Sequence, residues 1–325
     1  MRIRAVLRRL LVVGLAGACL CMPPLARAGT VAIFYYPWYA TPATDGVWQH
    51  WDQNGHRPPV DLYSRFFPAF GPYSSSDPAV VDRQMTELAS AGVNEVVVSW
   101  WGRGSVEDRR LPLVASDARR HGLVVAIHLE PYPDRSPATI AADLAYIATL
   151  GIRDVYVYHP RDLDAPVWAS LRQHVPTTIR LFAGTARPGF AAAGRFDGIY
   201  TYDFVTYRGG SFSRLCTEAH AVHLLCEPSV GPGYDGLRAG EQSPTRARRN
   251  GATYDALWAA AIRARPDGVT ITSFNEWGEG TQIEPARPRR GYRGYDGAWG
   301  LTGPAAQTAY LDRTAYWAAR YRGLR

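Results

Sequence analysis

The sequence contains no lysine, only four cysteines, and no apolar run long enough to cross a bilayer. All 36 basic residues among its 325 are arginines, a usage that we attribute to genomic bias rather than to a binding surface. So few cysteines exclude a disulfide-stapled miniature protein, and the missing apolar runs exclude a multi-span membrane protein. The chain is nevertheless 46% hydrophobic and 12% aromatic, which is enough to fill a core and excludes a disordered protein.

The formal net charge of +7 depends largely on the N-terminus. Residues 1–28 hold five arginines and no acid, so the rest of the chain has 31 basic against 29 acidic residues. This leaves a net charge of +2. A chain so close to neutral gives no reason to expect nucleic acid or another polyanion as a partner.

The first 28 residues have the pattern of a signal peptide. A basic segment, residues 1–9, precedes the apolar residues 10–22, and Ala26-Arg27-Ala28 fits the small-x-small cleavage pattern before Gly29. We therefore expect a secreted or periplasmic protein. The alternative is a lipoprotein signal ending at Cys19, but no leucine lies three residues before that cysteine, so we expect lipidation less.

Cleavage after Ala28 leaves two cysteines, Cys216 and Cys226, in the mature chain. In an oxidising compartment they could form a disulfide, or they could be two separate buried thiols, and the sequence leaves both open. No histidines stand at ligand spacing from them, so we expect no metal site.

Strand-like and helix-like segments alternate eight times after the signal. The expected strands are residues 31–39, 93–101, 123–130, 154–158, 178–184, 197–203, 224–229 and 268–274. The expected helices are residues 78–89, 107–121, 137–150, 165–174, 211–222, 253–265 and 305–321, with a weak one at 188–194. This alternation predicts an α/β fold, a single (β/α)8 TIM barrel spanning residues 29–325. An open doubly wound sheet is less favoured, because the first strand ends in Pro37-Trp38-Tyr39 where a glycine-rich nucleotide loop would begin.

Aromatic and acidic residues gather where the expected strands end, which is where barrel enzymes carry their active sites. Tyrosines and tryptophans recur at seven of the eight ends, together with acids such as Glu130 and Asp203. Flat rings suit sugar C–H faces and carboxylates suit hydroxyls, so the pattern indicates a carbohydrate site. Any single tyrosine is better explained by the strand preference of aromatic residues, but their concentration at the strand ends together with acids is not.

The eighth strand carries the sharpest signal. Asn275-Glu276-Trp277-Gly278-Glu279 places two carboxylates three residues apart at the start of a loop. Glycoside hydrolysis typically uses two carboxyl groups, so Glu276 and Glu279 are the candidate catalytic pair. We expect Glu284, beside Pro285, to be a solvated loop residue.

With these motifs the sequence resembles glycoside hydrolase family 99, the endo-α-1,2-mannosidases and endo-α-1,2-mannanases. The matching segments are residues 34–39, 71–75, 98–100, 128–132, 196–202, 229–234 and 271–284. The resemblance implies a secreted or lumenal barrel enzyme without cofactor or metal that cleaves inside α-mannosyl chains with retention. We separately expect a monomer.

The resemblance also implies roles. Glu279 would be general acid and then base at the glycosidic oxygen, while Glu276 would draw the proton from the 2-hydroxyl, which attacks to give a 1,2-anhydro sugar. Glu130 would contact substrate hydroxyls before the cut. The implied wall and anchor residues are Trp100, Tyr202 and Asn275 and, on weaker grounds, Tyr36, Tyr158, Tyr234 and His128.

Two departures from the family pattern stand out, and the first would change the environment of Glu279 and with it the pH optimum. Gly278 stands where a histidine is usual, and residues 237–240 replace an expected Arg-Pro-Trp. The second departure affects the distal subsite. It leaves open a related barrel enzyme that acts on another exported polysaccharide, or a barrel that binds glycans without cleaving them.

Overall fold

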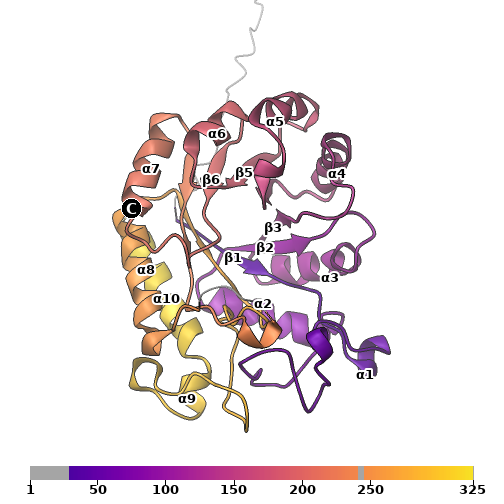
Figure 1. Ribbon diagram of the computed structural model, residues 1–325, viewed down its shortest axis with the longest axis vertical. Coiled ribbons are helices and arrows are strands. Elements are labelled where there is room, and N and C mark those ends of the chain that lie inside the picture. The colour runs from indigo at the N-terminus through magenta and orange to yellow at the C-terminus, as the bar shows by residue number, and fades with distance from the viewer. Residues whose placement is uncertain (1–28, 241–244, 325) are drawn as a thin grey trace, which may run out of the picture.

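A parallel β-sheet of nine strands forms the centre of the computed structural model, which describes residues 29–240 and 245–324 (Figure 1). The predicted signal peptide and the alternative lipid site lie outside the described residues. The strands are β1 (Thr30–Tyr35), β2 (Glu95–Trp100), β3 (Val124–Leu129), β4 (Asp154–Val157), β5 (Arg180–Gly184), β6 (Gly198–Tyr200), β7 (Leu225–Glu227), β8 (Ser229–Val230) and β9 (Gly268–Ile271). Each expected strand is present, although most are shorter than predicted.

The sheet curls into a nearly closed barrel. Its order is β7-β6-β5-β4-β3-β2-β1-β9-β8, so the two edge strands are consecutive in the chain. They are separated only by Pro228, which has no N–H to donate to a ladder. β7 therefore pairs with β6, while β8 pairs with β9. The backbone N–H of Ser229 donates to the Thr201 hydroxyl at 2.8 Å. The predicted seventh strand is thus two short strands that join the ends of the sheet.

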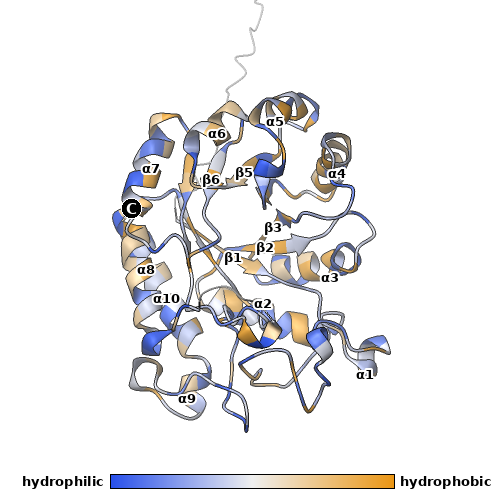
Figure 2. Ribbon diagram, in the orientation of Figure 1, coloured by the Kyte–Doolittle hydropathy of each residue, from blue (hydrophilic) through white to orange (hydrophobic). Residues whose placement is uncertain are grey.

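Helices surround the sheet. The main ones are α2 (Pro78–Ser90), α3 (Val106–Arg120), α4 (Pro137–Thr149), α5 (Ala165–Leu171), α6 (Pro188–Ala193), α7 (Phe212–Ala221), α8 (Ala252–Arg263) and α10 (Ala309–Arg322). Several starts follow the sequence directly: Asp77 accepts from the N–H of Ala79, with Pro78 in the first turn of α2. In Figure 2 the helices carry both hydrophilic and hydrophobic residues, as expected for a layer between core and solvent.

Alternation along β1 directs neighbouring tyrosines to opposite sides. Phe34 and Tyr36 belong to the aromatic cluster inside the barrel, together with Tyr156 and Tyr200. Tyr35 points the other way and donates to Gln84 of α2 at 2.6 Å. The inward set leads to the carboxyl ends of the strands.

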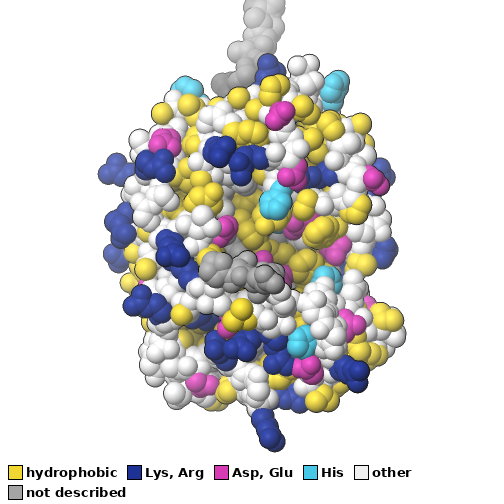
Figure 3. Space-filling model, viewed as in Figure 1, with side chains coloured by type: hydrophobic (Ala, Val, Ile, Leu, Met, Phe, Trp, Pro, Cys, Tyr) yellow, Lys and Arg dark blue, Asp and Glu magenta, His cyan; other side chains and the backbone are white. Residues whose placement is uncertain are grey.

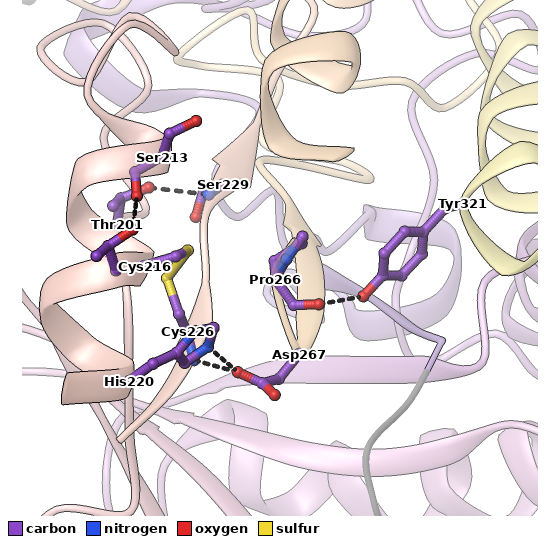
Figure 4. The surroundings of a disulfide bond; sticks show 10 residues. Thr201, Ser213, Cys216, His220, Cys226, Ser229, Pro266, Asp267 and Tyr321 are labelled. Atoms are coloured by element: carbon purple, nitrogen blue, oxygen red, sulfur yellow. Dashed lines mark hydrogen bonds and ion pairs between the residues drawn. A yellow bond between two sulfur atoms is a disulfide. The ribbon is translucent and has the colours of Figure 1, made fainter. Parts of the chain in front are cut away.

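A disulfide joins Cys216 of α7 to Cys226 of β7, with the Cα atoms 5.3 Å apart (Figure 4). Asp267 supports this corner, since its carboxylate accepts from the N–H of Cys226 and contacts His220, both at 2.9 Å. Of the two possibilities that the sequence left open, the structure contains the disulfide.

Candidate active site

The two candidate carboxylates lie on a tight loop that follows β9. The loop closes on itself, because the N–H of Ser273 donates to the carbonyl of Thr281 at 3.1 Å. Gly280, with φ at +64°, permits the turn between the acids and the returning chain. Glu276 is buried and its Oε1 accepts from the N–H of Gly278 at 3.0 Å, whereas Glu279 is half-buried.

Glu279 lies between two cavities. One, of about 260 Å³, is lined by Tyr158, Tyr202 and Tyr234 together with Glu279. The other, of about 190 Å³, is lined by residues that include both carboxylates, and also Trp38, His50, Tyr63 and Ala239. The face shown in Figure 3 is hollowed at its centre, with hydrophobic side chains on its floor. The arrangement places one acid at a junction that two sugar rings could flank.

Tyr36 is close enough to three carboxylates for their charges to affect its hydroxyl. Its hydroxyl is 2.5 Å from that of Tyr202. Burial raises the pKa of Tyr36 well above its usual value, and the charges of Glu279, Glu130 and Glu276 raise it further. The phenol therefore stays protonated and can donate a hydrogen bond at any physiological pH. Glu130, which is far in sequence from Glu276 and Glu279, therefore lies with them around Tyr36.

Glu130 is fixed by a buried network. Its Oε1 accepts from Ser99 and contacts Nδ1 of His128, each at 2.8 Å, and Nε2 of His128 lies 2.8 Å from the Tyr200 hydroxyl. The His128 ring also stacks on Tyr202 with the ring centroids 5.3 Å apart. His128 thus orients Glu130 and Tyr202 from below the surface.

Five of the predicted contact residues line neither cavity: Glu130, His128 and Tyr36, described above, and Trp100 and Asn275. Trp100 is fully buried and donates to Asp108 at 2.9 Å, and Asn275 is fully buried and holds the backbone of Tyr36 through bonds of 2.8 and 3.0 Å. Neither belongs to the described residues that line the two cavities. Asn275 anchors the backbone just after β1 against the loop of the candidate carboxylates, and the Trp100 ring packs edge-on against Tyr132.

Sequence reasoning missed Trp38, His50 and Tyr63. Trp38 and His50 stack with centroids 4.3 Å apart and planes 9° from parallel. Burial, followed by the nearby Arg110, lowers the pKa of His50 to about 4, so this ring is neutral at pH 7. The Tyr63 hydroxyl donates to Glu276 Oε1 at 3.4 Å. Trp38 stands at the aromatic end of the first expected strand, and His50 and Tyr63 lie in the long polar and aromatic segment after it. Neither pattern says which rings turn inward.

The expectation for Glu284 was wrong. This side chain is buried and accepts from Tyr73 and Gln84 at 2.7 Å each and from the Trp277 indole at 2.9 Å. Burial raises its pKa. Three donors compensate for its burial, and Glu284 holds Trp277, which stands between the two candidate carboxylates in sequence.

The altered segment at residues 237–240 is tied to the loop at residues 52–62. Arg238 donates to the carbonyl of Leu62 at 2.7 Å and pairs with Asp61, while its guanidinium lies 4.7 Å above the Tyr292 ring. The next residue, Ala239, lines the cavity of Trp38. A small side chain therefore stands in the segment where a large aromatic residue was expected.

Over residues 29–240 and 245–324, no group of three or more His, Cys, Asp or Glu side chains is arranged to hold a metal ion. No helix in that same part of the chain is long and apolar enough to span a membrane.

Residues 27–163 and 178–323 match the sequence model of glycosyl hydrolase family 99. The chain belongs to this family, and it is a glycoside hydrolase. A Mus musculus glycoprotein endo-alpha-1,2-mannosidase-like protein is 33% identical, over 89% of this chain and 75% of that protein. The Rattus norvegicus glycoprotein endo-alpha-1,2-mannosidase is 30% identical, over 92% and 76%. The structure of the GH99 endo-alpha-mannosidase from Bacteroides thetaiotaomicron superposes with a TM-score of 0.83 at 30% identity, covering 91% of this chain and 98% of that one. The resemblance drawn from sequence motifs is confirmed.

Proposed function

We propose that this family 99 protein hydrolyses internal α-1,2-mannosidic bonds with retention, using Glu276 and Glu279 as its catalytic pair. The names of its relatives support the bond type. The observation that carries the roles is the position of Glu279, which lines both cavities, whereas Glu276 lines only one. An acid that protonates a glycosidic oxygen must reach the junction of two sugars, and Glu279 meets that requirement.

In the first step, the substrate 2-hydroxyl attacks the anomeric carbon as the glycosidic bond breaks. Glu276 takes the hydroxyl proton and Glu279 gives its proton to the leaving oxygen, which yields a 1,2-anhydro sugar. The attack is intramolecular, so orientation supplies much of the rate. The N–H of Gly278 and the Tyr63 hydroxyl stabilise negative charge on Glu276 Oε1, as a base requires.

In the second step, Glu279 takes a proton from water, the water oxygen opens the anhydro ring, and Glu276 returns its proton to the 2-oxygen. Both carboxyl groups regain their starting states. Because Glu276 lines only the cavity of Trp38 and His50, the sugar that offers its 2-hydroxyl would occupy that cavity. The leaving sugar would then contact Tyr158, Tyr202 and Tyr234.

Incubation with α-1,2-linked manno-oligosaccharides, followed by mass spectrometry, tests the proposal. Internal fragments that disappear in Glu279→Gln support it. Binding without cleavage by the unaltered protein would instead indicate a glycan-binding barrel. If the unaltered protein neither binds nor cleaves these oligosaccharides, its substrate is a different polysaccharide.

We also propose that residues 1–28 direct export to the periplasm or beyond and that the mature protein is a monomer. The disulfide between Cys216 and Cys226 supports an oxidising compartment. Mass spectrometry of the protein expressed in its host should give an N-terminus at Gly29. A lipid-modified Cys19 at the N-terminus would contradict cleavage at that site. Size-exclusion chromatography with light scattering tests the monomer.

A further inference from the structure

A third and larger cavity, of about 640 Å³, adjoins the active site and has no part in the chemistry described above. Five arginines and two aspartates are among the residues that line it, an excess of three positive charges in a mature chain that is nearly neutral. These residues are Arg65, Arg246, Arg248, Arg249, Arg293, Asp235 and Asp296. We call it the arginine cavity.

Only a thin wall separates the arginine cavity from the catalytic pair. Tyr234 lines both this cavity and that of Tyr202. The N–H of Asp235 donates to the backbone carbonyl of Glu279 at 2.8 Å, and Gly280, the residue after the acid, is part of the lining. A glycan chain that leaves the pair past Tyr234 would therefore enter the arginine cavity.

The positive charge is held in place by aromatic rings. The guanidinium of Arg248 lies 4.6, 4.9 and 4.7 Å from the rings of Phe66, Tyr295 and Tyr310. Its Nη2 donates to the carbonyls of Gly280 and Gln282 at 2.9 and 2.6 Å. Such stacking and bonding fix an arginine that would otherwise move freely in solvent.

Protein groups neutralise this charge only in part. Asp235 lies 3.0 Å from Arg293 and 3.4 Å from Arg65, so one carboxylate serves two arginines. Within residues 29–240 and 245–324, the buried Nε and Nη1 atoms of Arg248 have no hydrogen-bond partner, and Arg249 makes no ion pair.

Arg246 lies on the side towards the cavity of Tyr202 and donates to the carbonyl of Phe204. Burial lowers its pKa, and the neighbouring Arg208 lowers it further. Like charges are therefore crowded here, which an anion would relieve. In Figure 3 arginine side chains gather beside the central hollow.

We propose that the arginine cavity binds an anionic substituent of the substrate glycan, a uronic-acid carboxylate or a phosphate ester, on the leaving-group side of the cut. The inference rests on the proposed function and narrows its substrate class. Arginine forks bind carboxylate and phosphate oxygens in pairs, which supplies both charge and geometry. Leu237, from the segment that departs from the family pattern, also lines the cavity.

The test measures binding by isothermal titration calorimetry to the Glu279→Gln protein, which cannot consume its ligand. Three probes of equal length are compared: neutral α-1,2-mannotetraose, the same chain with a 6-phosphate on the reducing-end mannose, and the same chain with a reducing-end glucuronic acid. We expect one or both acidic probes to bind at least about tenfold more tightly at low salt. The advantage should shrink as NaCl is raised.

Further substitutions in the Glu279→Gln protein test whether the tighter binding of acidic probes comes from the arginine cavity. In Arg249→Gln, and more strongly in Arg249→Gln with Arg293→Gln, the ratio of neutral to acidic Kd should fall towards one. Arg119→Gln, on the exposed side of α3, is the matched control and should keep the ratio. The phosphate and uronate arms identify the anion.

Equal affinity for neutral and acidic probes would overturn this inference and leave the proposed function standing. The inference would also be overturned if the Arg249→Gln, Arg293→Gln protein keeps its preference for acidic probes while its Tm matches that of the parent. If no probe binds while the protein is folded, the proposed function fails with it.

Discussion

The ring of Tyr63 fills the space that a side chain on Gly278 would occupy. A Cβ atom built on Gly278 would lie 2.4 Å from Cε2 of Tyr63 and 2.7 Å from its hydroxyl oxygen. The same hydroxyl donates to Glu276 at 3.4 Å. The glycine at this unusual position and the tyrosine from a distant loop are therefore a matched pair, and the phenol supplies a donor to the catalytic loop.

The first prediction concerns this pair. Gly278→Ala should displace the buried Tyr63 ring, lower the free energy of unfolding by about 1–3 kcal/mol and reduce kcat. Gly189→Ala is the control: it has an open position in α6, where alanine favours the helix and should not destabilise. Thermal unfolding and initial rates measure both. Equal behaviour of the two variants would show that the Tyr63 contact is unimportant.

The adjacent tyrosines at the end of β1, Tyr35 and Tyr36, give a second prediction. Tyr36→Phe removes a protonated phenol from among three carboxylates and should lower kcat/KM at least about tenfold. Tyr35→Phe removes a hydrogen bond to Gln84 of α2, on the outer face of the barrel wall. It should cost about 1 kcal/mol of stability without changing kcat. Steady-state kinetics and thermal melts distinguish them. A loss of kcat in Tyr35→Phe equal to that in Tyr36→Phe would mean that the inward position of Tyr36 has no special role.

The disulfide gives a third prediction. Because Cys216 and Cys226 are ten residues apart, replacing both with alanine should cost about 3 kcal/mol by loop-closure entropy. Reduction of the unaltered protein with dithiothreitol should lower its Tm to about that of the double variant. Dithiothreitol should not change the Tm of the double variant. A double variant as stable as the parent would contradict a formed disulfide.

The fourth prediction concerns pH. Burial, with the charge of Glu284, raises the pKa of Glu87 from 4.5 to about 8. The folded state therefore holds more protons than the unfolded state between these values, and stability falls as pH rises through that range. Glu87→Gln removes the titrating group, so it should be more stable than the parent at pH 8.5, on the order of 2 kcal/mol, and should gain little at pH 4.5.

The exposed pair of Arg214 and Glu218 supplies the control for this measurement. Glu218→Gln should change Tm little at either pH. Melting curves from pH 4.5 to 8.5 make the comparison. An equal gain for Glu87→Gln at both ends of the range would mean that proton uptake is not the cause.

Hydrophobic periodicity and turn residues predicted the strand and helix order, because each strand is a short apolar run bounded by helix signals such as Asp77-Pro78. The break at Pro228 was not predicted. A proline in an apolar run signals an interruption, but only the closure of the sheet shows that residues on either side pair with different neighbours.

Motifs at the strand ends led to Glu276, Glu279 and Glu130, and the roles of these residues stay predictions. The burial of individual side chains could not be predicted from the sequence. Glu284 and Trp100 look like rim residues in sequence, but the fold covers them. The arginine cavity was missed for a related reason. Net charge averages over the chain, whereas the arginines of this cavity come from three separate segments and meet only in the fold.

The central claim is that Glu276 and Glu279 perform the chemistry, and the most direct measurement is the rate of internal cleavage of an α-1,2-linked manno-oligosaccharide by Glu276→Gln and Glu279→Gln. Each variant should fold normally and lose activity by about 10²–10⁴-fold. If both retain turnover within a few-fold of the parent, these two residues are not the catalytic pair.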